Sequence, residues 1–232
     1  ALTEVSNDTE LKSASNLTWG NWTSAGDTIV KPGPEMVRYV DSDSSPAQKS
    51  YAVGEFVPPV PPVASVFFED DFEGTNAWAT TGAGATLWER GTPNYINGAF
   101  GVYITNALSG SNAWGTDLDY EYFTGTDITL TSPAIDLAGA TSASVVWWER
   151  MDIDDSSSTD AGMVNIIDLT AGTNLLVHSD QGADAGDWAE RSAAVPASAL
   201  GHSVQVQFHF LDDGVPSGGW GGWYIDDVAV TD

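Results

Sequence analysis

Residues 203–210 read SVQVQFHF, and this stretch decides the class of fold. Valine or phenylalanine occupies every even position, while glutamine or histidine occupies each odd position from 205 to 209. Side chains alternate between the two faces of a β-strand, so the run predicts a strand with one buried face and one wet face. Such a strand is typical of an antiparallel sheet, because parallel sheets are usually buried on both faces.

Short runs of the same character fill the chain from residue 66 onward. Clusters of Gly, Asn, Asp, Ser and Pro separate them, and no run has the period of a convincing amphipathic helix. The pattern predicts an all-β fold, a two-sheet antiparallel β-sandwich. The clearest runs are FFEDDF (67–72), DITLTSPAIDL (127–137), SASVVWWERMDI (142–153), GMVNIIDL (162–169) and WYIDDVAV (223–230).

The N-terminal quarter of the chain differs in composition from the rest. Residues 1–56 are polar and contain two short β-like runs, at 28–30 and 36–40, so we expect an extended arm. Residues 57–65 begin with VPPVPPV and predict a stiff proline-rich linker to the domain at 66–232. Two alternatives stay open for the arm: it folds back on its own domain, or it adds a strand to the sheet of a neighbouring copy.

Composition excludes several classes of partner and of chemistry. Seven basic residues against 33 acidic ones give a net charge of −26, which would repel nucleic acid and anionic membranes. The absence of cysteine excludes disulfides, Cys-ligated zinc and thiol catalysis. No apolar run approaches the ~20 residues of a membrane helix, so membrane insertion is not expected. Because the chain starts at Ala1 and not at Met, we expect a leader to have been removed and the protein to be secreted.

An ordered series of motifs carries a family resemblance over residues 66–232. FFEDDFEG, WERGTPN, LTSPAIDL, VVWWERMDIDD, VQVQFHFLDD and GWYIDDVAV follow one another in the chain. The series resembles the MAM-like jelly-roll module of secreted bacterial proteins, found in the C-terminal region of immune-inhibitor-A-type metalloproteases and in choice-of-anchor J and cleaved-adhesin domains. The resemblance implies a jelly roll on an extracellular or cell-surface protein, often stabilised by calcium and without catalysis of its own.

The resemblance also implies a Ca²⁺ site shared by the opening and closing strands. The matching positions are Asp71 and Glu73 in EDDFEG and Asp227, with Asp226 less favoured, in YIDDV. Carboxylate oxygens are the ligands that Ca²⁺ prefers, and an ion would offset the cost of burying these charges. The alternative is that the carboxylates cap loops or meet a basic residue. Which of Asp226 and Asp227 faces the ion stays open.

Two further groups of residues are candidates for binding. Asp152, Asp154, Asp155 and Asp160 lie in one acidic loop that lacks the glycine and terminal glutamate of an EF-hand, so a solvated turn is favoured over a second metal site. Most of the ten tryptophans should fill the core. Trp148, Trp220 and Trp223 are candidates for a ligand-stacking surface, and Trp220 is the foremost because it lies in a glycine-rich loop.

The sequence contains no H-E-x-x-H, G-x-S-x-G or P-loop signature, so we do not expect an enzyme. A triad or carboxylate pair assembled in space stays open but has no positive support. The prediction is a secreted, non-catalytic, calcium-stabilised jelly-roll protein that is structural or adhesive. It would associate with itself, in one version as a filament subunit, or with a surface glycan. The alternative is a carbohydrate- or substrate-binding accessory domain of a secreted hydrolase.

Overall fold

A computed structural model describes residues 65–232 and five strands nearer the N-terminus. Within residues 65–232 the description omits positions 76, 84–86, 98–100, 155–159, 182–183 and 216–218. The chain divides into two compact units, Ala1–Val63 and Ala64–Asp232. The predicted VPPVPPV linker lies outside the described residues.

The N-terminal unit contains two small antiparallel sheets. In one, β1 (Thr9–Ala14) pairs with both β2 (Thr23–Ser24) and β5 (Ser50–Glu55). In the other, β3 (Ile29–Gly33) pairs with β4 (Met36–Tyr39). The two β-like runs of the arm, at 28–30 and 36–40, lie in strands that pair with each other within this unit. Donation of a strand to a neighbouring copy stays a prediction.

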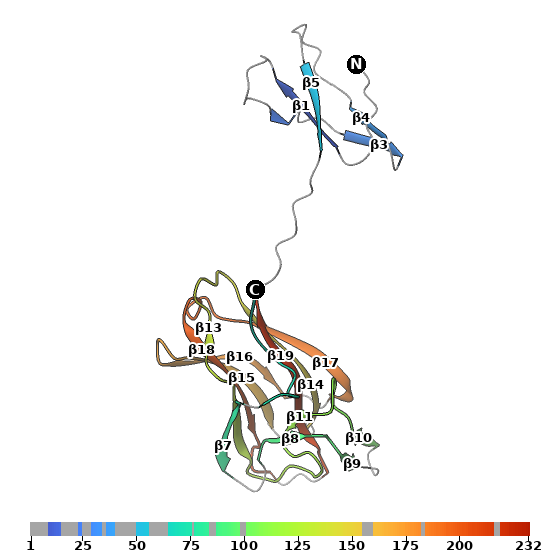
Figure 1. The fold of residues 1–232 in the computed structure, drawn as a ribbon. Helices are drawn as coiled ribbons and strands as arrows, with labels where there is room; N and C mark the ends of the chain where they lie inside the picture. Colours follow the sequence, from blue (N-terminus) through green and yellow to red (C-terminus); the bar gives the residue numbers. More distant parts are fainter. Residues whose placement is uncertain are drawn as a thin grey trace. The chain divides into compact units, whose positions relative to one another are not determined.

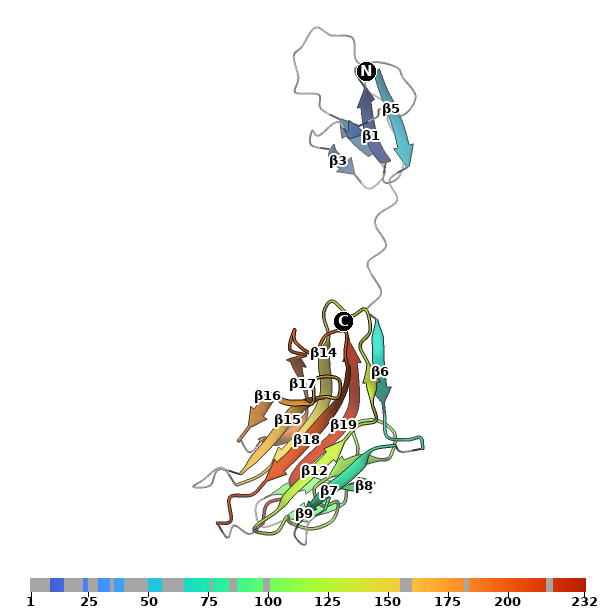
Figure 2. The same ribbon diagram turned by 90° about the vertical axis from the view of Figure 1, so that its left-hand side faces the viewer.

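The C-terminal unit is a sandwich of two six-stranded sheets, and every strand pair in it is antiparallel (Figures 1 and 2). Sheet one has the order β17 (Asp184–Ala194), β14 (Ser144–Asp152), β19 (Gly222–Thr231), β11 (Ala113–Gly115) and β8 (Glu89–Gly91), with β6 (Val66–Asp70) paired to β19. Sheet two has the order β16 (Thr173–Asp180), β15 (Ala161–Asp168), β18 (Ser203–Leu211), β12 (Asp127–Thr131) and β7 (Ala79–Ala83), with β13 (Ile135–Asp136) paired to β18. A separate ribbon joins β9 (Tyr95–Asn97) to β10 (Val102–Ile104).

The predicted all-β sandwich is confirmed. Only strands, turns and loops occur among the described residues, and no helix there is long and apolar enough to cross a membrane.

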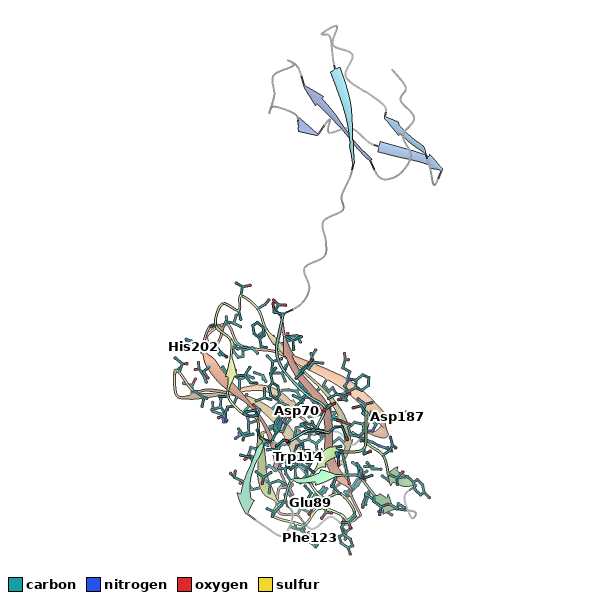
Figure 3. The ribbon with its side chains drawn as sticks, viewed as in Figure 1. Asp70, Glu89, Trp114, Phe123, Asp187 and His202 are labelled. Carbon is teal, nitrogen blue, oxygen red and sulfur yellow. The ribbon has the colours of Figure 1, made fainter. Side chains whose placement is uncertain are left out.

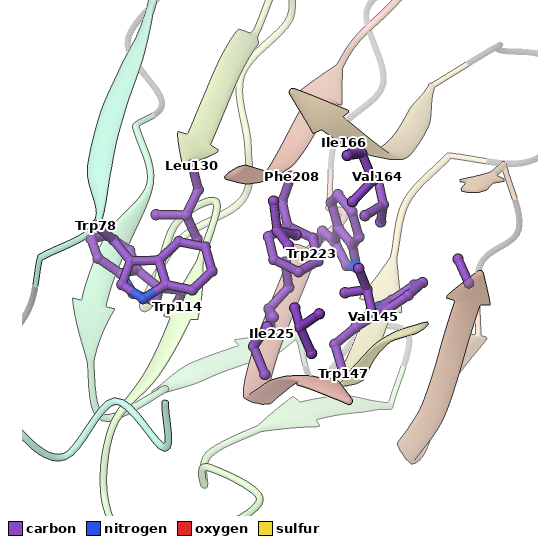
Figure 4. Close-up of a cluster of buried hydrophobic side chains, with 14 of the residues drawn as sticks. Trp78, Trp114, Leu130, Val145, Trp147, Val164, Ile166, Phe208, Trp223 and Ile225 are labelled. Atoms are coloured by element: carbon purple, nitrogen blue, oxygen red, sulfur yellow. The ribbon is translucent and has the colours of Figure 1, made fainter. Parts of the chain in front are cut away.

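The main core lies between the two sheets and follows the alternation seen in the sequence. The four apolar side chains of SVQVQFHF are fully buried, while Gln205, Gln207 and His209 are half-buried on the other face. Phe208 meets sheet one through ring contacts with Trp147 and Trp223, at centroid separations of 6.0 and 5.6 Å (Figure 4). Burying a side chain of this size contributes about 1.5–3 kcal/mol, so the alternation itself drives the two sheets together.

One carboxylate is built into this core. Glu149 on β14 is 2% exposed and accepts hydrogen bonds from the indole nitrogens of Trp147 and Trp223, at 2.8 and 2.9 Å. Its other oxygen accepts from Arg191 Nε on the adjacent strand β17 at 2.8 Å. A buried carboxylate with a cationic partner and further hydrogen bonds avoids the cost of an unpaired charge.

The outer face of β19 is also covered. Tyr224 is fully buried in a second apolar cluster, together with Tyr95, Ile104 and Trp188. Strand β19 is therefore buried on both faces near its start, where a strand of an antiparallel sandwich usually has one wet face. This second layer determines the surroundings of Asp226.

Candidate functional site

The opening and closing strands of the sandwich lie side by side. β6 pairs with β19 in antiparallel register, with Asp70 opposite Val228 and Glu69 opposite Ala229. The expectation that these strands are neighbours is confirmed. The predicted calcium ligands lie beside this strand pair, in a region that we call the seam, but no three of these described residues bring ligand oxygens within 4.8 Å of one another. They are Asp71, Glu73, Asp226 and Asp227.

A β-bulge separates the two adjacent aspartates of YIDDV. Val146 of β14 lies opposite Ala229 and Trp148 lies opposite Asp226, so two residues of β19 occupy the space opposite Trp147. Asp227 adopts a φ of 44°, in the left-handed region that a side chain rarely enters. Bulges of this kind redirect a side chain, and here Asp226 stays buried while Asp227 is half-buried.

Asp226 is fully buried and its partners are backbone amides. Its Oδ2 accepts hydrogen bonds from the N–H groups of Leu108 and Ser109, at 2.9 and 3.2 Å, and its Oδ1 accepts from the N–H of Asp227. Burial raises the pKa of Asp226 to about 6, although these amide donors oppose the shift. The neighbouring charge of Asp227 adds to the rise, so a cation nearby would favour the ionised form.

Glu73 binds the same loop, between β10 and β11, at residues further along the chain. Its Oε1 accepts from the backbone N–H groups of Ser111 and Asn112, at 2.7 and 2.6 Å, and these bonds hold the pKa of Glu73 below its usual value. The Asn112 side-chain amide donates to Oε2. At Gly110 a Cβ would come within 2.5 Å of the Glu73 carboxyl group, so the close approach requires glycine. Glu73 and Asp226 thus clamp residues 108–112.

Asp71 and Asp227 line an open hollow of about 540 Å³ beside the clamp. Four of its seven lining residues are acidic and none is basic; they are Glu69, Asp70, Asp71, Gly74, Asp227, Val228 and Ala229. The Asp70 carboxylate already accepts hydrogen bonds from Phe72 N and Trp78 Nε1. A hollow lined by carboxylates without a basic residue fits the oxygen-rich coordination of Ca²⁺.

The prediction that the second acidic group is a solvated turn is wrong for its described residues, because Asp152, Asp154 and Asp160 are all buried. Tyr122 Oη accepts from Asp154 N and donates to Asp160. Asp152 accepts a hydrogen bond from Gly221 N at 2.7 Å, Asp154 is buried, and Asp155 lies outside the described residues. Asp160 instead groups with Asp212 and Asp213, whose carboxylates the sequence analysis did not connect with it. A second described group that could hold a metal ion combines Glu149, His178 and Asp180.

None of the three tryptophans predicted to bind a ligand is fully exposed at the surface. Trp223 is fully buried in the core, so its side chain is not available at the surface. Trp148 is half-buried against the second apolar cluster, and Trp220 is half-buried against the main core. Trp220 keeps some exposed surface, and its carbonyl accepts a hydrogen bond from Tyr122 N at 3.3 Å.

Sequence reasoning missed an exposed aromatic pair in the segment next to Trp220. Tyr120 and Phe123 are 57% and 43% exposed, and their rings stack with centroids 6.0 Å apart and planes 18° apart. Figure 3 shows Phe123 at the end of the sandwich opposite the C-terminus. The signal in the sequence is YEYF at 120–123, a group of aromatics within an acidic loop. We call residues 117–126 the aromatic loop.

Comparison with known proteins concerns the fold. No family model matches the chain, and no significant match to a curated protein was found. Similar solved structures include the K3 cleaved adhesin domain of Lys-gingipain from Porphyromonas gingivalis, at 17% identity and a TM-score of 0.46, covering 73% of this chain and 99% of that chain. The CBM22-1 xylan-binding domain of Paenibacillus barcinonensis Xyn10C matches at 11% identity and a TM-score of 0.42, covering 72% of this chain and 94% of that chain. The family 11 carbohydrate-binding module of Clostridium thermocellum Lic26A-Cel5E matches at 10% identity and a TM-score of 0.43, covering 72% of this chain and 94% of that chain.

Proposed function

We propose that this chain is a secreted, non-catalytic binding module that attaches to glycans through its aromatic loop and is stabilised by calcium at the seam. The observation that carries the proposal is the stacked, exposed pair of Tyr120 and Phe123. Two adjacent exposed rings form an apolar patch, and the faces of aromatic rings pack against the apolar face of a sugar ring.

Hydrogen bonds within the aromatic loop and to the segment before Trp220 hold the loop in one conformation. The Asp117 carboxylate accepts hydrogen bonds from Asp119 N and Tyr120 N, at 3.2 and 3.0 Å. Glu121 accepts a hydrogen bond from Gly219 N, next to Trp220. A loop held in its binding conformation loses less entropy when a ligand binds. The same surface would serve a free-standing adhesive protein and an accessory domain of a secreted hydrolase.

Glycan binding by the full chain, measured on a glycan array and then by titration with the best ligand, tests this function. Phe123→Ala and Tyr120→Ala should each weaken binding about tenfold, which corresponds to ~1.4 kcal/mol of lost stacking. Tyr103→Ala is the matched control, because Tyr103 is 53% exposed on β10 outside the aromatic loop. Equal binding by all three variants, or no glycan bound by the natural chain, contradicts the proposal.

Calcium at the seam should raise thermal stability. Binding to the folded state alone, at a concentration about 100 times Kd, adds ~2.7 kcal/mol, so chelation should lower Tm by roughly 5–10 °C. Asp227→Asn should reduce this difference, because Asp227 lines the hollow. Asp136→Asn, which changes an exposed carboxylate on β13, should leave it unchanged. A melting temperature that is the same with CaCl₂ and with chelator rules out the site.

A further inference from the structure

Three carboxylates lie together where the loop that precedes β15 meets the loop that follows β18. Ala161, the first residue of β15, pairs with Leu211, the last residue of β18, so Asp160 and Asp212 are brought together by the register of the sheet. One ligand oxygen from each of Asp160, Asp212 and Asp213 lies within 4.8 Å of the others. Asp160 and Asp212 are 1% and 5% exposed, so two of the three charges are almost removed from water.

The hydrogen bonds at this group leave one buried oxygen without a partner. Asp212 Oδ1 accepts from the N–H groups of Gly125 and Gly214, whereas Asp212 Oδ2 is buried and accepts no hydrogen bond from the residues that the structure describes. Each oxygen of Asp160 accepts one hydrogen bond, from Tyr122 Oη and from Asp213 N. A carboxylate oxygen has two lone pairs, so Asp160 retains capacity for a further ligand.

No cation among the described residues offsets these buried charges. Neither Asp160 nor Asp212 forms an ion pair with a Lys, Arg or His in that part of the chain. An uncompensated pair of buried carboxylates is strongly unfavourable.

The other acidic group differs in this respect. In the group of Glu149, His178 and Asp180, the Arg191 guanidinium lies 2.8 Å from Glu149 and 4.0 Å from Asp180. A positive charge is thus already supplied by the chain. Each group contains one unpartnered buried ligand atom, His178 Nε2 in one and Asp212 Oδ2 in the other, but among the described residues only the buried carboxylates of the group around Asp212 have no cationic side chain paired with them.

We propose that Asp160, Asp212 and Asp213 bind a divalent cation of the calcium type, at a site separate from the seam. The donors are all carboxylate oxygens, which select hard cations over zinc or copper. Ca²⁺ takes six to eight oxygen ligands, and the exposed position of Asp213 leaves room for water to complete the shell. The cation supplies the partner that Asp212 Oδ2 lacks.

The same residues hold the aromatic loop in place. Tyr122 donates to Asp160, Gly125 N donates to Asp212, and Asp212 N donates to the carbonyl of Thr126 at 2.8 Å. A cation here joins the start of β15 to the end of β18, and both of these ends are hydrogen-bonded to the aromatic loop. The cation site itself does not depend on the proposed glycan function, but its effect on ligand binding rests on that function.

Titration of CaCl₂ into the metal-stripped full chain by calorimetry tests the site, with Asp227→Asn as the background that weakens the seam. This variant should still bind one Ca²⁺, and adding Asp212→Asn should abolish that binding or weaken it at least tenfold. Asp136→Asn in the same background should bind as before. The absence of Ca²⁺ binding in the Asp227→Asn background, or unchanged binding after Asp212→Asn, overturns the proposal.

A fold control separates loss of the ligand from loss of structure. Near-ultraviolet circular dichroism of Asp212→Asn should match that of the natural chain. If it does not, Asp213→Asn replaces it, because Asp213 is exposed and its replacement disturbs no buried packing. Asp213→Asn should weaken Ca²⁺ binding about tenfold, and unchanged affinity overturns the proposal. Glycan titration is a separate readout, so a negative result there leaves the cation measurement intact.

Discussion

Glu149→Ala should lower the free energy of unfolding by about 3–5 kcal/mol, because it breaks a buried network without replacing it. The substitution leaves the indole N–H groups of Trp147 and Trp223 without their acceptor. It also leaves the Arg191 guanidinium without its nearest carboxylate. Each buried donor that loses its partner costs ~1–3 kcal/mol, and the deleted side chain leaves a cavity between the sheets.

Urea unfolding followed by tryptophan fluorescence measures the effect. Glu190→Ala is the matched control, since Glu190 lies on the neighbouring strand β17 and is exposed. That change should stay within about 0.5 kcal/mol of the natural chain. Glu149→Gln should lose less than Glu149→Ala, because it keeps one acceptor oxygen and most of the volume. Similar losses for Glu149→Ala and Glu190→Ala would show that the network contributes nothing to stability.

Gly222→Ala should lower the free energy of unfolding by about 2–5 kcal/mol, combining a left-handed backbone with overpacking. Gly222 begins β19 with a φ of 92°, and a Cβ there would lie 2.0 Å from Thr116 Oγ1. Thr116 cannot easily move away. Its Oγ1 accepts from Trp223 N and its own N–H donates to Trp223 O, both at 3.0 Å.

Gly139→Ala separates the two causes. Gly139 has a φ of 80°, but a Cβ there would meet nothing within 4 Å, so only backbone strain of ~1–2 kcal/mol is expected. The difference between the two variants, measured in the same urea titration, is the cost of the clash between the added Cβ and Thr116. Equal losses at both positions would mean that Thr116 moves aside at no cost and that overpacking does not contribute.

The seam shows how far the sequence could predict the site. The neighbouring positions of β6 and β19 were expected, and the structure has them paired. The partners of Asp226 were not predictable, because they are backbone amides of a loop whose sequence, LSGSN, carries no charge signal. The bulge at Asp227 could not be predicted either, since the alternation of side chains along a strand assumes an uninterrupted ladder of hydrogen bonds.

The aromatic candidates illustrate the same limit. Tryptophan count and glycine content favoured Trp220 and Trp223, but burial depends on what packs over a residue from elsewhere in the chain. Trp223 points into the core against Phe208, while the exposed pair belongs to Tyr120 and Phe123, in a loop with no regular period. Periodicity therefore could not predict which aromatics reach the surface.

The sequence by itself determined the all-β class and the buried face of β18, because the two-residue period of a strand is a local property. It also determined the acidic surplus that makes cation binding favourable. Only the tertiary structure decided which carboxylates meet. Asp160 reaches Asp212 through the register of β15 on β18, and Asp226 reaches residues 108 and 109 through a second layer over β19. These contacts depend on which distant segments pair, and the alternation within one strand does not specify its partner.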